Sequence, residues 1–273
     1  MLKIILLALT AAFMVHADPL TLGWTNNMLR ISGPQVPGDF IEIWYLEAFC
    51  RSGSTHRKWE ETTIPHKTEL ISATPQKIRL RTKVESSVIL EHEITAGADE
   101  VDFKVSARND GREFVDAQWF QPCMRVDRFT GAKQNNYIEK SFIFTKDGAK
   151  LLSDLPRNEE AIYRGGQVYV PEGIPINDVN PRPISDIKPA NNLIGCYSKD
   201  GKKLLATAWD STQELFQGVI VCLHNDPRLG GLKPSELKSL RGKLYLLENN
   251  IPALLARYKK DFPSSSSASS ASK

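Results

Sequence analysis

The amino-acid sequence predicts a mainly β protein, an antiparallel β-sandwich with one C-terminal helix. Short segments rich in β-branched and aromatic residues recur along most of the chain, and turn signals of Gly, Pro, Asn and Asp separate them. A single segment near the C-terminus has the apolar spacing of an amphipathic helix. Strands that follow one another without helices between them favour an antiparallel meander over βαβ units.

The chain opens with the features of a secretory signal peptide. Lys3 precedes an apolar run over residues 4–15, and Val15-His16-Ala17 has the small-x-small pattern of a signal peptidase site. The run is shorter than the roughly 20 residues that a membrane-spanning helix needs. We therefore expect residues 1–17 to be removed, the mature protein to be exported to the periplasm or the extracellular space, and no membrane span to remain.

Composition places the rest of the chain among ordinary globular proteins. Residues 18–263 are expected to form a single β-sandwich domain, and the Ser-rich residues 264–273 a disordered tail. Hydrophobic residues make up 41% and charged residues 25% of the sequence, values typical of a domain with a normal core. A formal net charge of +3 gives no indication of a nucleic-acid partner, so none is expected. The oligomeric state stays open.

The predicted strands begin with residues 40–50, where FIEIWYLEAFC combines β-branched and aromatic residues. Further strand signals follow at short intervals, at residues 62–72, 77–85, 87–95, 100–109 and 114–126. In the fourth of these, Val101, Phe103 and Val105 alternate with polar residues, which indicates a strand with one face on the core. This regular spacing predicts a meander.

The middle of the chain, residues 130–192, is less regular. After a hairpin-like stretch at residues 137–150 it becomes rich in Pro and Asn and ends in NDVNPRP. Its aromatic and apolar residues favour a long loop that covers the domain. Strand signals resume at residues 192–197, 203–209, 215–224 and 237–247.

The predicted helix begins at Asn249 or Asn250, either of which can cap it, and carries Pro252 in its first turn. One face presents apolar side chains, namely Ile251, Leu254, Leu255 and Tyr258. Pro263 ends the helix. A helix of this kind is expected to pack on the sandwich as a lid.

Four cysteines follow the signal peptide: Cys50, Cys123, Cys196 and Cys222. In an oxidising compartment these four cysteines could form two disulfides. Each cysteine, however, lies in an apolar, strand-like context, and a core of this size is stable without disulfides. We expect buried thiols and no metal site through these sulfurs. P-loop, G-x-G-x-x-G and G-x-S-x-G motifs are absent, so no cofactor and no serine triad are expected.

The densest group of polar side chains lies in residues 119–128. On a strand, alternate residues share one face, which would align Trp119, Gln121, Cys123, Arg125 and Asp127. An indole beside amide, guanidinium and carboxylate groups is the composition of a sugar site. A structural ion-pair network is the equally weighted alternative.

A second group surrounds Glu47, which lies on an apolar strand and must either face a cleft or pair with a base such as Arg51 or His66. A carboxylate beside a histidine provides general acid and base groups. His66 is more commonly a hydrogen-bonded strand-end residue, whereas His224 ends an apolar strand at a turn, where a cleft rim is expected. The proposed catalytic residues are His66, His224, Glu47 and Asp127, and the proposed substrate-binding residues are Trp119, Gln121, Arg125, Arg128, Arg51 and Arg182.

Several segments resemble a family of exported bacterial proteins, among them IWYLEAFCR, TTIPHKTELIS, QPCMRVDRFTG and ATAWDSTQELFQGVIVCLHNDPRLGGLKP. The strand order, EVDFKVSARNDG and GGLKPSELKSLRGKLYL are also similar to galactose-mutarotase-like β-supersandwich domains. This resemblance implies a carbohydrate-interacting protein, because the superfamily includes sugar epimerases and sandwich domains of polysaccharide lyases and glycoside hydrolases. Mutarotases carry a catalytic histidine in an Asn-His context, which this chain lacks.

Two functions therefore remain open from the sequence. The first is an epimerase-like, mutarotase-like or lyase-like enzyme that uses acid–base residues in a cleft. The second is a noncatalytic module that binds glycan or another surface component. Convergence of His66, His224 and a carboxylate would favour the first.

Overall fold

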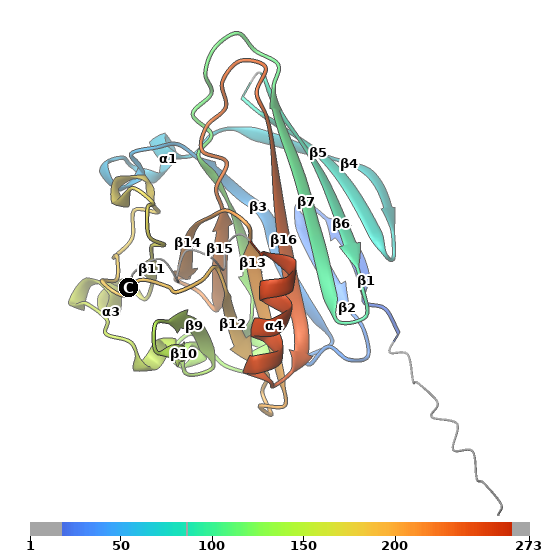
Figure 1. Cartoon of the computed structure of the whole chain (residues 1–273), viewed down its shortest axis with the longest axis vertical. Helices are drawn as coiled ribbons and strands as arrows, with labels where there is room; N and C mark the ends of the chain where they lie inside the picture. The colour runs from blue at the N-terminus through green and yellow to red at the C-terminus, as the bar shows by residue number, and fades with distance from the viewer. Residues whose placement is uncertain (1–17, 86, 264–273) are drawn as a thin grey trace, which may run out of the picture.

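The computed structural model describes residues 18–85 and 87–263, which form two antiparallel sheets and a C-terminal helix (Figure 1). The prediction of a mainly β, antiparallel sandwich with this helix is confirmed. The expected signal peptide, residues 1–17, and the expected tail, residues 264–273, lie outside the described residues. Within the described part of the chain, helices are too short or too polar to cross a membrane.

One sheet has seven strands. In spatial order they are β1 (Thr21–Thr25), β2 (Met28–Ser32), β3 (Phe40–Cys50), β8 (Trp119–Arg125), β15 (Cys222–Pro227), β14 (Thr212–Gln217) and β11 (Gln167–Tyr169). The β1–β2 hairpin was not predicted from the sequence. Its two-residue loop, Asn26-Asn27, has φ values of 50° and 62°, a left-handed backbone that asparagine tolerates and that tight hairpins require.

The other sheet has nine strands. In spatial order they are β10 (Gly148–Leu151), β9 (Ser141–Thr145), β12 (Ile194–Tyr197), β13 (Lys203–Trp209), β16 (Leu237–Glu248), β7 (Glu100–Asn109), β6 (Val88–Ala96), β5 (Lys77–Val84) and β4 (His66–Thr74). The run from β4 to β7 pairs each strand with the next, so the predicted meander is confirmed for these four strands. The strands predicted before and after them, β3 and β8, lie in the other sheet. Its alternating burial follows the alternating sequence.

The main core lies between the facing sides of the two sheets. Ile43 and Met124 of the seven-stranded sheet belong to the same buried cluster as Phe103 and Trp209 of the nine-stranded sheet. Tyr45 crosses the interface, with its ring stacked on Phe103 at a centroid separation of 5.5 Å. The side of each sheet that is turned away from this core is its outer face.

Three predicted strands differ from the structure. Residues 215–224 form parts of two strands, β14 and β15, because the chain reverses at Gly218, where the missing side chain leaves room for that of Cys222. The strand predicted at residues 62–72 begins only at His66, after the short helix α1 (Trp59–Thr62). The strand predicted at residues 114–126 is confined to β8, and Val126 turns the chain into helix α2 (Asp127–Thr130).

The predicted C-terminal helix is confirmed as α4 (Ile251–Asp261). The Asn250 side chain caps it by accepting a hydrogen bond from the Ala253 amide at 3.0 Å. Leu254 and Tyr258 are buried against apolar side chains on the outer face of the nine-stranded sheet, which α4 crosses in Figure 1. The lid position therefore follows from the apolar face that the sequence showed.

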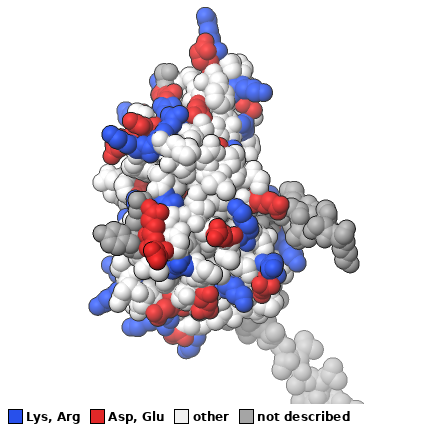
Figure 2. Space-filling model, turned by 90° about the vertical axis from the view of Figure 1, so that its left-hand side faces the viewer, with Lys and Arg blue, Asp and Glu red and all other residues white. Residues whose placement is uncertain are grey.

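The irregular middle segment was predicted to cover the domain. Apart from β9, β10 and β11, which belong to the sheets themselves, it lies over part of the outer face of the seven-stranded sheet. It contains η2 (Tyr137–Glu139), η3 (Leu152–Asp154), α3 (Glu159–Arg164), β11 and η4 (Ile176–Asp178), and a further turn, η1 (Ser54–His56), packs against η4. Val168, Val170 and Val179 of this segment pack on Phe216 of β14. Figure 2 shows this side of the molecule, where acidic and basic side chains are interspersed without a continuous area of one sign.

Candidate functional site

A cavity of about 380 Å³ lies on the outer face of the seven-stranded sheet, beneath the covering segment. Strand alternation directs Gln121 and Cys123 of β8 and Cys222 and His224 of β15 to this face, with His224 opposite Cys123 in register. On β3 the register shifts between Trp44 and Ala48, and within this irregularity the Glu47 side chain reaches the cavity wall. The sheet therefore brings a carboxylate and an imidazole together.

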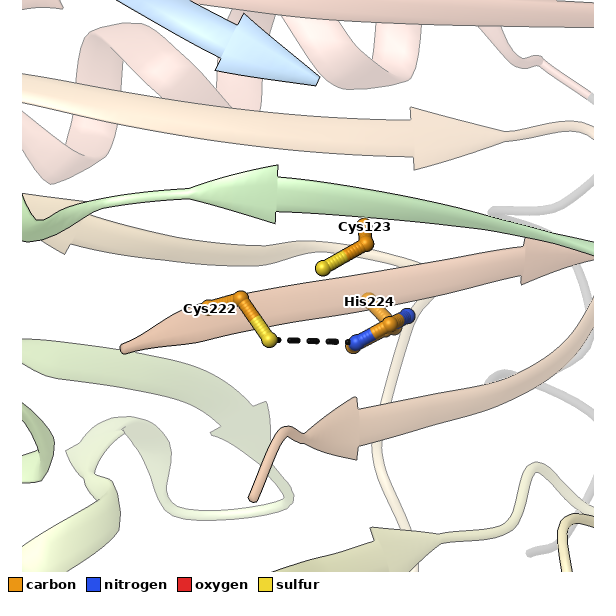
Figure 3. A group of neighbouring side chains, drawn as sticks. All are labelled: Cys123, Cys222 and His224. Atoms are coloured by element: carbon orange, nitrogen blue, oxygen red, sulfur yellow. Dashed lines mark hydrogen bonds between the residues drawn. The ribbon is translucent and has the colours of Figure 1, made fainter. Parts of the chain in front are cut away.

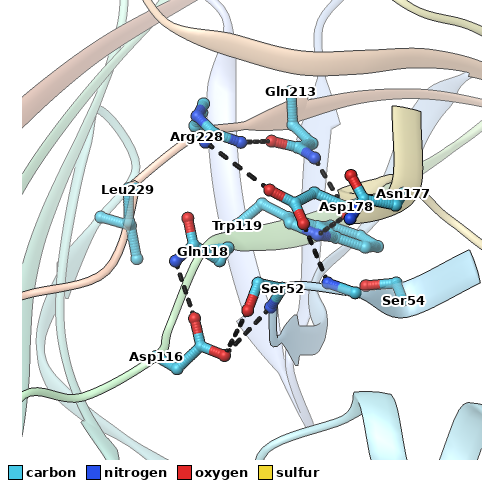
Figure 4. A network of polar contacts seen from close by, with 12 residues as sticks. Ser52, Ser54, Asp116, Gln118, Trp119, Asn177, Asp178, Gln213, Arg228 and Leu229 are labelled. Atoms are coloured by element: carbon cyan, nitrogen blue, oxygen red, sulfur yellow. Dashed lines mark hydrogen bonds and ion pairs between the residues drawn. The ribbon is translucent and has the colours of Figure 1, made fainter. Parts of the chain in front are cut away.

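Asp178 holds the covering segment on the sheet (Figure 4). Its main-chain oxygen accepts hydrogen bonds from the Trp119 indole at 3.0 Å and the Gln213 amide at 3.1 Å. Its carboxylate accepts from the Gly53 amide at 2.9 Å and lies 4.0 Å from the Arg228 guanidinium. One residue of the cover thus connects four separate parts of the chain, which places the next residues, Asn180 to Arg182, at the cavity.

Glu47 and His224 form the central pair of the cavity. Glu47 Oε2 lies 4.0 Å from His224 Nδ1, and the exposed fractions of the two side chains are 25% and 3%. His224 Nδ1 also lies 3.1 Å from Gln121 Nε2, and His224 Nε2 lies 3.2 Å from Cys222 Sγ. Burial lowers the pKa of His224, but interactions with Cys123, Glu47 and Glu214 outweigh burial and raise it. The pair therefore favours a charged imidazole beside a carboxylate.

Two polar atoms at this pair lack hydrogen bonds. Glu47 Oε2 and Gln121 Oε1 are buried, and neither has a hydrogen-bond partner among the described residues. A buried oxygen without a partner costs about 1–3 kcal/mol, so such atoms in a cavity wall indicate a place where a polar ligand binds.

A pair of carboxyl groups lies beside the cavity. Glu214 of β14 and Asp226 of β15 are opposite one another in register, and both are fully buried. Burial raises the pKa of both, and the repulsion between the two charges raises that of Asp226 further. Asn180 donates a backbone hydrogen bond to Glu214 Oε2 at 2.8 Å, and Asp226 lies 3.9 Å from His224 Nδ1. The pair retains a proton under conditions where isolated carboxyl groups have lost theirs.

The structure brings four of the predicted site residues together. Glu47, His224, Gln121 and Arg182 all line the cavity. The condition for an acid–base function was convergence of His66, His224 and a carboxylate. It is met only in part, because Glu47 lies 4.0 Å from His224 while His66 lines a different cavity.

His66 lies apart from His224. Its ring nitrogens contact the main-chain oxygens of Ile64 at 3.4 Å and Leu46 at 3.3 Å, and its ring packs on Phe49. It lines a neighbouring cavity of about 420 Å³, which shares Glu47 with the first. These contacts are those of a strand-end histidine.

Trp119 and the basic residues near it occupy structural positions. The predicted role of Trp119 as a stacking platform is wrong, because its side chain is fully buried under the covering segment and its indole binds Asp178. Arg51 forms an ion pair with Glu85 and not with Glu47, whose carboxylate lies near His224. The Arg128 guanidinium lies 4.4 Å from the centre of the Phe40 ring.

Arg125 and Asp127 do not line the cavity. The predicted common face assumed a strand through Asp127, but β8 ends at Arg125 and Asp127 is exposed on α2. The alternation that would align them is lost where the strand becomes a helical turn.

The cavity also contains residues that the sequence analysis did not select. They are Arg57, Trp59, Asn180, Pro181, Phe216, Val219 and Ile220, together with the two cysteines of its floor. Arg57 and Trp59 come from the loop and short helix after β3, where no local pattern indicates contact with β15. An exposed tryptophan in a polar loop was the available signal, since Trp59 retains 37% of its surface.

Comparison with solved structures finds proteins of similar architecture at low sequence identity. A galactose mutarotase-like protein from Lactobacillus casei matches with 10% identity and a TM-score of 0.44, over 83% of this chain and 99% of its own. A putative aldose 1-epimerase from Escherichia coli matches with 9% identity and a TM-score of 0.42, over 84% and 99%. A galactose 1-epimerase from Lactobacillus acidophilus matches with 8% identity and a TM-score of 0.40, over 85% and 99%.

Identities and TM-scores this low carry no argument about the activity of this chain. No protein-family model matches the sequence, and no curated protein matches it.

Proposed function

We propose that the cavity binds a carbohydrate and that Glu47 and His224 transfer protons on the bound sugar. The observation that carries this proposal is the Glu47–His224 pair in the cavity wall, with a separation of 4.0 Å between carboxylate and imidazole. A volume of about 380 Å³ lies within the usual range for a small-molecule site.

The reaction that suits this pair is interconversion at the anomeric carbon. Glu47 removes the proton of the anomeric hydroxyl while His224 protonates the ring oxygen, which breaks the carbon–oxygen bond and opens the ring. Rotation about the adjacent carbon–carbon bond and the reverse proton transfers close the ring in the other configuration. Protons are conserved, and no oxidant or cofactor is required. The raised pKa of His224 supports its role as the acid.

The rest of the wall suits a sugar that carries an acidic group. Arg57 and Arg182 reach the cavity from two different segments, and a guanidinium binds a carboxylate or a pair of hydroxyls through parallel hydrogen bonds. Trp59 and Phe216 offer aromatic surfaces to the C–H groups of a sugar ring. We therefore place uronic acids ahead of neutral hexoses as ligands.

The decisive measurement is the rate of anomer exchange, followed by NMR, for a panel of neutral and acidic sugars. Glu47→Gln is expected to lower the enzymatic rate by about 10²- to 10⁴-fold, because it removes the base. Glu42→Gln is the matched control on the same strand, since Glu42 forms an exposed ion pair with Arg30 outside the cavity. Sugar binding without faster exchange would contradict proton transfer and leave the noncatalytic binding module.

Export is part of the same proposal. The signal pattern before Asp18 predicts that protein recovered from outside the cytoplasm starts at that residue. N-terminal sequencing of secreted protein tests this, and retention of Met1 in the recovered chain would contradict it.

A further inference from the structure

Two thiols and an imidazole gather on the floor of the cavity. The Sγ atoms of Cys123 and Cys222 and a ring nitrogen of His224 all lie within 4.8 Å of one another. Figure 3 shows the three side chains on the same face of neighbouring strands. Cys222 and His224 share this face because they are two residues apart on β15, and Cys123 is the register partner of His224 on β8.

We propose that Cys123, Cys222 and His224 form a binding site for a thiophilic divalent metal ion, with zinc as the first choice. Two thiolates and one imidazole are a ligand set that Zn²⁺ prefers. Zn–S bonds of about 2.3 Å and Zn–N bonds of about 2.0–2.1 Å place the ligand atoms of a tetrahedral site roughly 3.3–3.8 Å apart. The Cys222 Sγ to His224 Nε2 distance of 3.2 Å is already close to that spacing.

The surroundings of His224 match those of a metal-bound histidine. Such a histidine usually binds the metal through one nitrogen and donates the other N–H to a carboxylate or amide oxygen. Here Nε2 faces Cys222, while Nδ1 faces the Gln121 amide at 3.1 Å and Glu47 at 4.0 Å. With the amide turned so that its oxygen faces Nδ1, the otherwise unpartnered Gln121 Oε1 gains a donor.

The cavity gives the ion a position open to ligands. All three ligand residues line the wall, so three protein ligands leave the fourth position of a tetrahedral site for water or a hydroxyl group. Gly218 keeps the space beside the ligands free, because a Cβ at this residue would collide with Cys222 Sγ and lie 3.3 Å from His224 Nε2. The inference rests on different observations from the proposed sugar chemistry, but both use His224. A metal-bound imidazole is neutral, so His224 acts as the acid in the metal-free protein and as a ligand in the metal-bound protein.

The test uses the mature protein, first treated with a chelator and then titrated with Zn²⁺ or Co²⁺ in the absence of sugar. We expect one tightly held ion per chain, release of thiol protons on binding, and, with Co²⁺, sulfur-to-cobalt charge-transfer absorption with the intense d–d bands of tetrahedral coordination. Cys123→Ser, Cys222→Ser and His224→Ala should each lower affinity by at least about 100-fold.

Cys196→Ser is the matched control. Cys196 is an equally buried thiol, on β12 of the other sheet, and its removal should leave metal affinity unchanged. Gln121→Leu retains all three ligands, so a loss of about 10-fold in affinity would indicate the expected support of the His224 ring. This variant and the Co²⁺ spectrum of the unaltered protein keep the test valid where a ligand variant fails to fold.

Three results would overturn the inference: no thiolate–cobalt absorption, an equal loss of affinity in Cys196→Ser, or a Cys123–Cys222 disulfide in the isolated protein. Failure of the proposed sugar chemistry gives a different signature. Anomer exchange is measured on protein treated with chelator, whereas metal binding is measured without sugar, so each can fail while the other succeeds.

Discussion

Part of the outer face of each sheet is covered, and the two covered parts differ in what the cover encloses. Helix α4 encloses apolar side chains of the nine-stranded sheet. The buried cation Lys243 of β16, next to α4, is paired with Glu100 at 2.8 Å. The covering segment of the seven-stranded sheet encloses His224 and the carboxyl pair Glu214–Asp226, with several oxygen atoms unpartnered among the described residues.

The two covered regions differ in whether their buried groups stabilise the fold. Apolar contacts and paired charges stabilise a fold, whereas a buried polar atom without a partner destabilises it. Proteins retain such atoms mainly where they bind or react with something. The contrast between the two covers therefore supports the proposal that the site lies on the seven-stranded sheet.

The largest expected effect on stability is at the α4 cover. Leu254→Ala should lower the free energy of unfolding by about 4 kcal/mol, because it leaves a cavity where a fully buried side chain packs on the sheet. Leu237→Ala is the control, since that side chain is 65% exposed, and it should change stability by less than about 0.5 kcal/mol. Equal effects in urea denaturation would show that α4 does not stabilise the fold.

The carboxyl pair under the other cover should make stability depend on pH. The pKa of Glu214 is raised to about 7, so the folded state binds a proton more tightly than the unfolded chain. Stability is therefore lost as pH rises from about 4.5 to about 7. The loss is about 3 kcal/mol, since each pKa unit corresponds to about 1.4 kcal/mol. Asp226 adds a further loss, because burial and the charge of Glu214 raise its pKa as well. Asp226→Asn should remove this added part and leave the part that comes from burial of Glu214.

The measurement is the difference in unfolding free energy between the protein and Asp226→Asn at each pH. Groups outside the pair contribute equally to the pH dependence of the two proteins. One of them is His92: burial lowers its pKa to about 3, so stability rises with pH up to the ordinary histidine pKa of 6.5. The groups that face the pair are Glu47, His224, Cys50 and Cys123. The raised pKa of His224 lowers the stability of the protein only above pH 6.5. Between pH 4.5 and 6.5 the measured difference therefore reports on the Glu214–Asp226 pair. A difference that stays constant with pH would contradict a shared proton.

The smallest effect is expected where the cover is attached. Asp178→Ala should lower stability by about 1–2 kcal/mol, because the Gly53 amide loses its acceptor and Arg228 its counter-charge. Limited proteolysis should become faster within residues 170–185. Asp154→Ala is the control on an exposed residue of the same segment, and cleavage at the same rate in both variants would show that Asp178 does not hold the cover.

The sequence predicted those parts of the fold whose pattern is local. The meander β4–β7 and helix α4 follow from alternating or helical spacing and from the Asn250 cap. The division of residues 215–224 into two strands was missed because an apolar run is equally compatible with one strand, and the reversal depends on Gly218 packing against Cys222.

The candidate site was predictable in its residue types but not in its assembly. Glu47 and His224 were singled out because each is a polar residue in an apolar strand, yet their proximity depends on the order β3–β8–β15 and on the irregularity in β3. The Glu214–Asp226 pair likewise exists only through the register of β14 with β15. Neither strand order nor register is encoded in a local pattern.

The attachment of the cover through Asp178 has a consequence for how the site forms. Its partners Gly53 and Trp119 lie 125 and 59 residues away along the chain. Contacts of such high sequence separation form late in folding, because they require closure of long loops. The cavity is therefore a property of the completed chain: fragments that retain Glu47 or His224 alone contain reactive groups but no site, and ligand binding reports on the folding of the whole sandwich.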